Sequence, residues 1–162
     1  MKRIILSLLL ASAAPLCLQA QQVYTQIKQK ATQTASDPQA DDAVRQISRF
    51  KVNALDYMAM KMKEQMPDSA ATLLDRQALA MSNFVSLYVQ TLLDIRSQPQ
   101  AYQLKVMRLF IDASLSNPLF NDHDTDLVHS YVASENSLTR FSIDTDWPRA
   151  YIAVSTTLKK GF

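Results

Sequence analysis

The chain has 162 residues, with 17 lysines and arginines, 15 aspartates and glutamates, and a single glycine, Gly161. A balance this close to neutral gives no electrostatic reason to expect nucleic acid or an anionic membrane as a partner. The near absence of glycine excludes the phosphate-binding loop, the dinucleotide fingerprint and the glycine-flanked nucleophile elbow.

Residues 1 to 20 have the pattern of a secretory signal peptide. Lys2 and Arg3 precede an apolar run from 4 to 18, and the small residue Ala20 ends the segment. The apolar run is shorter than the roughly 20 residues that a transmembrane helix needs. We therefore expect export to the periplasm or the extracellular space, with no transmembrane segment in the mature chain.

Cys17, the only cysteine, raises the alternative of a lipid anchor. A lipidation site has a small residue directly before the cysteine, and this chain has Leu16 there, so the pattern favours soluble export over a lipoprotein. Cleavage after Ala20 would remove Cys17 together with Lys2 and Arg3. The mature chain would then be neutral, with 15 basic and 15 acidic residues, and would have neither a disulfide nor a thiolate ligand.

After position 20 the sequence predicts one helical unit that prolines divide. Residues 21 to 36 are expected to form a weakly amphipathic N-terminal helical segment, and residues 37 to 162 a helical bundle domain. Proline in the first turn, with a polar residue before it, is typical of a helix start. The prolines in this part are Pro38, Pro67, Pro99, Pro118 and Pro148.

The first two helices of the bundle have the clearest periods. In the helix predicted at about 38 to 65, where Asp41 and Asp42 suit the N-terminus, apolar residues recur every three or four positions. They are Ala43, Ile47, Phe50, Ala54, Met58, Met62 and Met66. The next helix has the same spacing and no charge from 77 to 93, so we expect it at the centre of the domain. Its apolar positions are Leu74, Ala78, Met81, Val85, Tyr88, Leu92 and Ile95.

Two more helices are predicted at about 100 to 116 and about 147 to 160. The first is expected to bury a face made by Leu104, Met107, Ile111 and Leu115, flanked by Val106 and Phe110. The second is expected to bury Trp147, Tyr151, Val154 and Leu158 and to end at Lys159, Lys160 and Gly161. Residues 128 to 133 are expected to form one or two helical turns. Residues 134 to 145 are expected to form the least regular connection between helices. No stretch alternates as a strand does, which predicts an all-α bundle of five or six helices.

The segment from 120 to 131 is the densest group of candidate metal ligands. Asp122, Asp124 and Asp126 alternate as in the opening of a calcium-binding loop. That loop needs glycine at its sixth position and glutamate at its twelfth. This chain has Leu127 and Ala133 there, and a calcium site of this type is therefore excluded.

Zinc is the other metal that this segment could hold. Asp126 and His129 would share one face of a helix, and His123 could approach them from the preceding loop. Capping explains the same residues without a metal, because the carboxylate of Asp122 or Asp124 can accept hydrogen bonds from the first free N–H groups of a helix. We favour capping, and we assign no metal-binding, cofactor-binding or catalytic residue.

Three further sets of residues have the same two interpretations. Met58, Met62 and Met66 offer soft ligands for copper, but their spacing is that of a buried helix face, and only Met60 lies outside it. Asp144 and Asp146 could form an acid–base pair, but they precede the last helix and are expected to cap it. The adjacent His129 and Ser130 would point to different faces of a helix, which argues against a nucleophile and its base.

The chain resembles small exported all-helical proteins of the Bacteroidetes in three places. They are FKVNALDYMAMK (50 to 61), NPLFND (117 to 122), and LQA before QQ at the end of the predicted signal peptide. Most of these proteins have no assigned function, and the resemblance implies no site residue. We expect a non-catalytic module of the cell envelope that binds another envelope protein or a small ligand. The alternative is a periplasmic protein that handles copper or zinc.

Overall fold

The computed structural model describes residues 22–68, 70–135 and 137–161, and the predicted signal peptide with Cys17 lies outside these residues. The described residues form seven α-helices and no strand, which confirms the expected all-α class. The long helices are α2 (Gln22–Ser36), α3 (Asp42–Gln65), α4 (Ala70–Asp94), α5 (Gln100–Leu115) and α8 (Trp147–Lys160). The single-turn helices are α6 (Thr125–Val128) and α7 (Ser130–Ala133).

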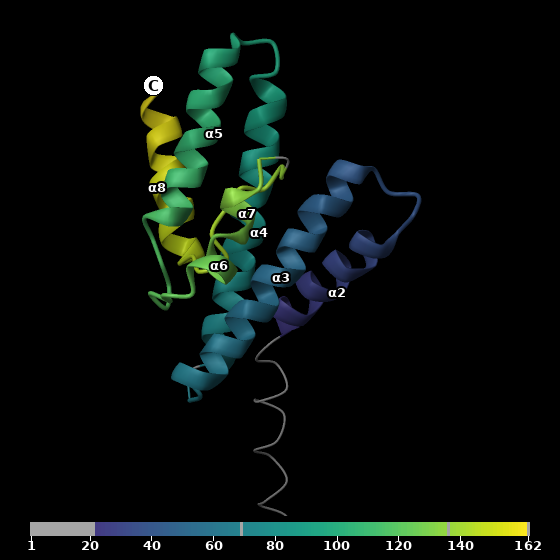
Figure 1. The fold of residues 1–162 in the computed structure, drawn as a ribbon, viewed down its shortest axis with the longest axis vertical. Helices are drawn as coiled ribbons and strands as arrows, with labels where there is room; N and C mark the ends of the chain where they lie inside the picture. Colours follow the sequence, from purple (N-terminus) through teal and green to yellow (C-terminus); the bar gives the residue numbers. More distant parts are fainter. Residues whose placement is uncertain (1–21, 69, 136, 162) are drawn as a thin grey trace, which may run out of the picture.

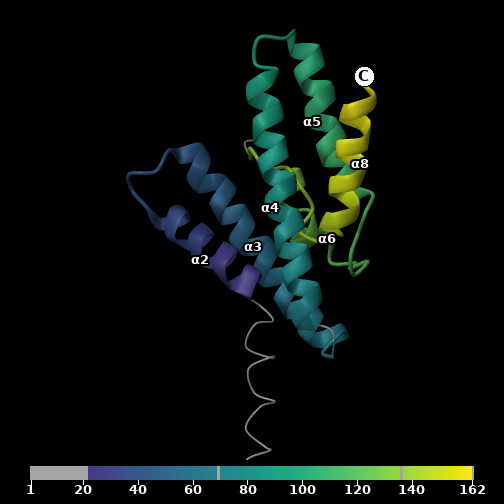
Figure 2. The same cartoon turned by 180° about the vertical axis from the view of Figure 1, so that it is seen from behind.

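The helices form two groups that meet along α4 (Figures 1 and 2). Helices α2 and α3 form a hairpin, and α2 packs against both α3 and α4. Helices α4 and α5 form a second hairpin, and α8 packs against both of them. In both views the connection between α2 and α3 lies well away from the connection between α4 and α5. None of the described helices is long and apolar enough to cross a membrane.

The core follows the two predicted apolar faces at the centre of the bundle. Phe50, Ala54, Met58 and Met62 of α3 are fully buried. Leu74, Ala78, Met81, Val85 and Tyr88 of α4 are buried against them. The residues at the ends of both faces, among them Ile47, Met66 and Leu92, are only partly buried. The helical period therefore predicted the centre of the core correctly.

The buried face of α5 differs from the predicted one. Leu104, expected in the core, is 55% exposed, whereas Val106, Phe110, Ala113 and Ser114 are buried. The Phe110 ring packs edge-on against Phe84 at 5.4 Å and Tyr88 at 5.1 Å between centroids. Two apolar faces lie side by side on this helix, and the one that carries the aromatic ring buries more area.

The described residues between 134 and 146 form no helix, as expected of a connection, but many of them are buried. Phe141 is fully buried and its ring packs against Phe50, Phe84 and Tyr88 at 5.0 to 5.7 Å. A buried segment outside regular structure must find partners for its backbone polar groups. A side chain of α5 supplies one of them, because Ser142 N–H donates to Ser114 (3.1 Å). Directly after the segment, the N–H of Trp147 donates to Gln77 of α4 (2.9 Å).

The helix ends follow the capping rules that the sequence suggested. Asp41 accepts a hydrogen bond from the N–H of Ala43 (2.8 Å) at the start of α3. Asp146 caps α8, which has Pro148 in its first turn. Gly161 ends α8 with a φ of 76°, a backbone conformation that glycine adopts without strain. The short region after Asp124 forms two separate turns because His129 leaves the helical conformation between them.

Replacement of the buried ring at position 141 should test whether this irregular segment belongs to the core. Phe141→Ala should lower the free energy of unfolding by about 3–5 kcal/mol, because a fully buried ring leaves a cavity. Leu104→Ala, at the exposed position of α5, should lower it by no more than about 0.5 kcal/mol. Urea denaturation followed by circular dichroism measures both values, and equal losses would contradict this description of the core.

Candidate functional site

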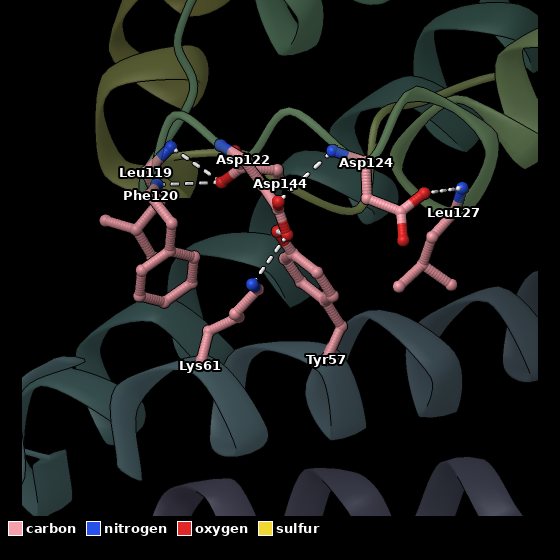
Figure 3. Close-up of polar contacts among 8 residues, drawn as sticks. All are labelled: Tyr57, Lys61, Leu119, Phe120, Asp122, Asp124, Leu127 and Asp144. Atoms are coloured by element: carbon pink, nitrogen blue, oxygen red, sulfur yellow. Dashed lines mark hydrogen bonds and ion pairs between the residues drawn. The ribbon is translucent and has the colours of Figure 1, made fainter. Parts of the chain in front are cut away.

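The acidic residue Asp144 lies at the centre of a buried polar cluster rather than at the end of a helix (Figure 3). It is 2% exposed, and its carboxylate accepts hydrogen bonds from three backbone N–H groups. Their donors are Leu119 (3.0 Å), Phe120 (2.8 Å) and Asp122 (2.9 Å). We call this arrangement, Asp144 with these three N–H groups, the Asp144 clamp.

The prediction that Asp144 caps α8 is therefore wrong, and Asp146 alone does so. Asp144 is two residues too early for the cap position and turns inward to the loop after α5. That loop reverses its direction at Asn121, which has a φ of 54°, and asparagine tolerates this left-handed conformation better than most residues. The reversal presents the N–H groups on both sides of Asn121 to one carboxylate.

The carboxylate of Asp122 joins the same loop to α3 (Figure 3). It accepts a hydrogen bond from the hydroxyl of Tyr57 (2.8 Å) and forms an ion pair with Lys61 (2.9 Å). Lys61, followed by Tyr57, lowers the pKa of Asp122 to about 2. Burial is the main cause that raises the pKa of Tyr57, and the hydrogen bond to Asp122 raises it further. The contact with Asp122 also raises the pKa of Lys61.

All three pKa shifts move away from neutrality. A general acid or base works best with a pKa near the pH at which it acts. Here the ionised carboxylate, the ammonium group and the neutral phenol each stabilise the others in one fixed protonation state. The cluster of Tyr57, Lys61 and Asp122 therefore has the electrostatics of a structural link between α3 and the loop.

The remaining residues of the acidic segment lie apart from one another. Asp124 caps α6 by accepting a hydrogen bond from the N–H of Leu127 (3.1 Å), as predicted. Asp126 and His123 are exposed, and His129 is partly buried at the break between α6 and α7. Within the described residues no three His, Cys, Asp or Glu side chains gather closely enough to hold a metal ion.

The methionine series follows the buried face of α3. Met58 and Met62 are fully enclosed by the core, Met66 is partly buried, and Met60 is exposed on another face. The only tryptophan, Trp147, is also fully buried. The thioethers of Met58 and Met62 thus act as core-filling groups.

A groove of about 480 Å³ lies where α2, α3 and α4 meet. Each helix contributes residues at the spacing of a single helical face, three or four positions apart. They are Ile27, Lys30, Ala31 and Thr34 of α2; Val44, Ile47, Ser48 and Lys51 of α3; and Ser82, Val85, Ser86, Val89 and Gln90 of α4. We call this hollow the three-helix groove.

Side-chain contacts attach the first half of α2 to α3 and α4, and small residues line the groove. Near the start of α2, the N–H of Tyr24 donates to Asp75 (2.8 Å) and Lys28 pairs with Asp56. Farther along α2, the groove residues include the small Ala31, and Ser48 lies opposite on α3; both are buried. A larger side chain at either position would occupy the space that the groove now leaves free.

The chemistry of the groove is mixed but has no negative charge. Isoleucine and valine side chains from all three helices form apolar walls, and hydroxyl groups and Gln90 add hydrogen-bonding positions. Lys30 and Lys51 bring positive charge, and no carboxylate is among the lining residues. Burial lowers the pKa of Lys51, and the nearby charge of Lys30 lowers it further.

A second hollow, of about 540 Å³, lies on another face of α3. Glutamine, arginine and asparagine side chains of α3 line it together with Tyr131 and several serines. A hydrogen bond from Asn53 to the hydroxyl of Tyr131 (2.6 Å) crosses its border. This hollow is wider open to solvent than the three-helix groove, and no aliphatic side chain is among its lining residues, which makes it the weaker candidate for an apolar ligand.

Sequence reasoning missed the three-helix groove because it depends on the angle between helices. Ile47 and Val85 were expected in the core, and nothing in their spacing separates a groove wall from a packed face. The one local signal is a set of small residues within apolar faces, at Ala31, Ser48 and Ser82. Such residues also occur at close helix contacts, so the signal alone does not predict a hollow.

No family model, no curated protein and no solved structure matches this chain. Its function must therefore be inferred from its own residues and from the geometry of the three-helix groove.

Removal of the charge at position 144 tests the clamp. Asp144→Asn leaves an NH₂ group opposite one of the three partly buried N–H donors, and we expect a loss of about 1–3 kcal/mol in the free energy of unfolding. Asp126→Asn, an exposed acidic residue of the same region, should change it by no more than about 0.5 kcal/mol. Urea denaturation measures the free energy of unfolding of both variants. A loss in Asp144→Asn no larger than the loss in Asp126→Asn would contradict the clamp.

The low pKa of Asp122 gives stability a defined pH dependence. The folded pKa of about 2 lies below the ordinary value of 3.8, so the stabilisation is fully present above about pH 4 and is lost as the pH falls towards 2. Asp122→Asn should flatten the decline of the unfolding free energy between these pH values. An unchanged slope in urea denaturation at pH 4, 3 and 2 would show that the ion pair with Lys61 does not stabilise the fold.

Proposed function

We propose that the protein is a non-catalytic binding module of the cell envelope that holds an elongated, largely apolar small molecule in the three-helix groove. The volume of about 480 Å³ supports this proposal, since ligand pockets commonly measure about 300–1,000 Å³. Their walls are usually apolar, with a few polar groups that orient the ligand. The residues of the three-helix groove have this composition.

Two features support binding rather than chemistry in this groove. Its lining residues include no histidine, aspartate or glutamate that could activate the hydroxyl groups of Ser48, Ser82 and Ser86 as a base. The titratable cluster at Asp122 belongs to another part of the molecule and is fixed in one protonation state. Export, as residues 1 to 20 indicate, would place the module in the envelope.

A bulky residue in the groove should weaken binding without loss of the fold. The fluorescent, uncharged probe N-phenyl-1-naphthylamine should bind the protein saturably at one site. Ser82→Phe fills the groove from α4, and we expect it to weaken probe binding about tenfold or more, which corresponds to about 1.4 kcal/mol. Asn83→Phe, an exposed neighbour outside the groove, is the matched control and should bind the probe as the unchanged protein does.

Fluorescence titration gives the affinities, and urea denaturation shows whether each variant is folded. Absence of saturable binding by the unchanged protein would refute the proposal. Equal binding by the two folded variants would place the probe somewhere other than in the three-helix groove.

A further inference from the structure

Two unpaired cations line the three-helix groove. Lys30 of α2 and Lys51 of α3 lie close enough for the charge of one to lower the pKa of the other. Neither forms an ion pair within the part of the chain that the structure describes. Lys51 is partly buried, whereas Lys30 is exposed. Like charges this close disfavour one another, and a bound anion would offset the repulsion.

Two lysines at neighbouring contacts between elements are each paired with a carboxylate. Lys28 of α2 meets Asp56, and Lys61 of α3 meets Asp122 at 2.9 Å. The groove thus differs from the neighbouring contacts between elements, where a carboxylate accompanies the lysine. The groove has two lysines and no carboxylate to pair with them, and an anionic ligand would supply that negative charge.

The apolar wall extends away from the two lysines along α3. Val44 and Ile47 line the groove on the same face as Lys51, within two helical turns of it. At 1.5 Å per residue the seven positions from Val44 to Lys51 span about 10 Å. Val85 and Val89 of α4 add a second apolar wall to the groove. A molecule that fills the groove would therefore need a charged end and an extended apolar part.

We propose that the ligand of the three-helix groove is a single-chain amphiphile with an anionic head group, which Lys30 and Lys51 bind while the chain lies along the valine and isoleucine walls. This inference rests on the proposed function and names the class of ligand. An acidic amphipathic helix fits less well, because the groove offers only two cations, Lys30 and Lys51, to the row of carboxylates along such a helix.

Displacement of N-phenyl-1-naphthylamine by matched amphiphiles tests the charge requirement. Dodecanoate, below its micellar concentration, should displace the probe at a concentration about tenfold lower than 1-dodecanol does, because only the former has a charge for the lysines. Dodecyl phosphate should compete as dodecanoate does if any anionic head suffices. A weaker phosphate would restrict the site to carboxylates, which is a narrower form of the same proposal.

The double variant Lys30→Met and Lys51→Met retains the apolar stems but removes both charges. It should lose the preference for dodecanoate over dodecanol, about tenfold, when the displacement by each compound is compared within the same variant. Lys63→Met, an exposed lysine of α3 outside the groove, is the control and should retain the preference.

The possible failures are distinguishable. Probe binding with equal competition by dodecanoate and dodecanol would overturn the anionic ligand and leave the proposed function intact. Absence of probe binding would refute the proposed function itself. Binding confined to an acidic amphipathic peptide or to anionic vesicles, with no competition by monomeric dodecanoate, would also overturn the amphiphile proposal.

Discussion

The carboxylate of Asp144 makes an irregular, buried segment compatible with a helical bundle. Three backbone N–H groups that have no helical partner converge on it, and each would cost about 1–3 kcal/mol if it were buried without an acceptor. The clamp fixes the loop after α5, and this loop presents Asp122 to Tyr57 and Lys61 of α3.

Helix α3 then serves two different regions. One face binds the clamped loop through Tyr57 and Lys61, and another forms the wall of the three-helix groove through Ile47, Ser48 and Lys51. The residues with the most conspicuous chemistry, the aspartates of the 120 to 131 segment and Asp144, thus serve the fold or the helix ends. The groove is built from common side chains, and its capacity to bind depends on which faces the helices turn toward one another.

The sequence predicted what local rules determine. Helical spacing identified the buried faces of α3 and α4, and capping rules identified the roles of Asp41, Asp124 and Asp146. It could not choose between two adjacent apolar faces of α5, because packing against rings of α4 decides that choice. The inward turn of Asp144 and the opening of the groove depend on contacts between residues far apart in the chain, for which spacing carries no signal.

The most direct test of this division between structural cluster and binding groove is an amide NMR titration of the ¹⁵N-labelled protein with N-phenyl-1-naphthylamine. The rings of the probe shift the resonances of nearby amides, and the largest changes are expected at Ala31, Ser48 and Val85, with those of Leu119 and Phe120 unaffected. Changes centred on the loop between α5 and α6, or spread evenly over the chain, would contradict the assignment of the three-helix groove as the ligand site.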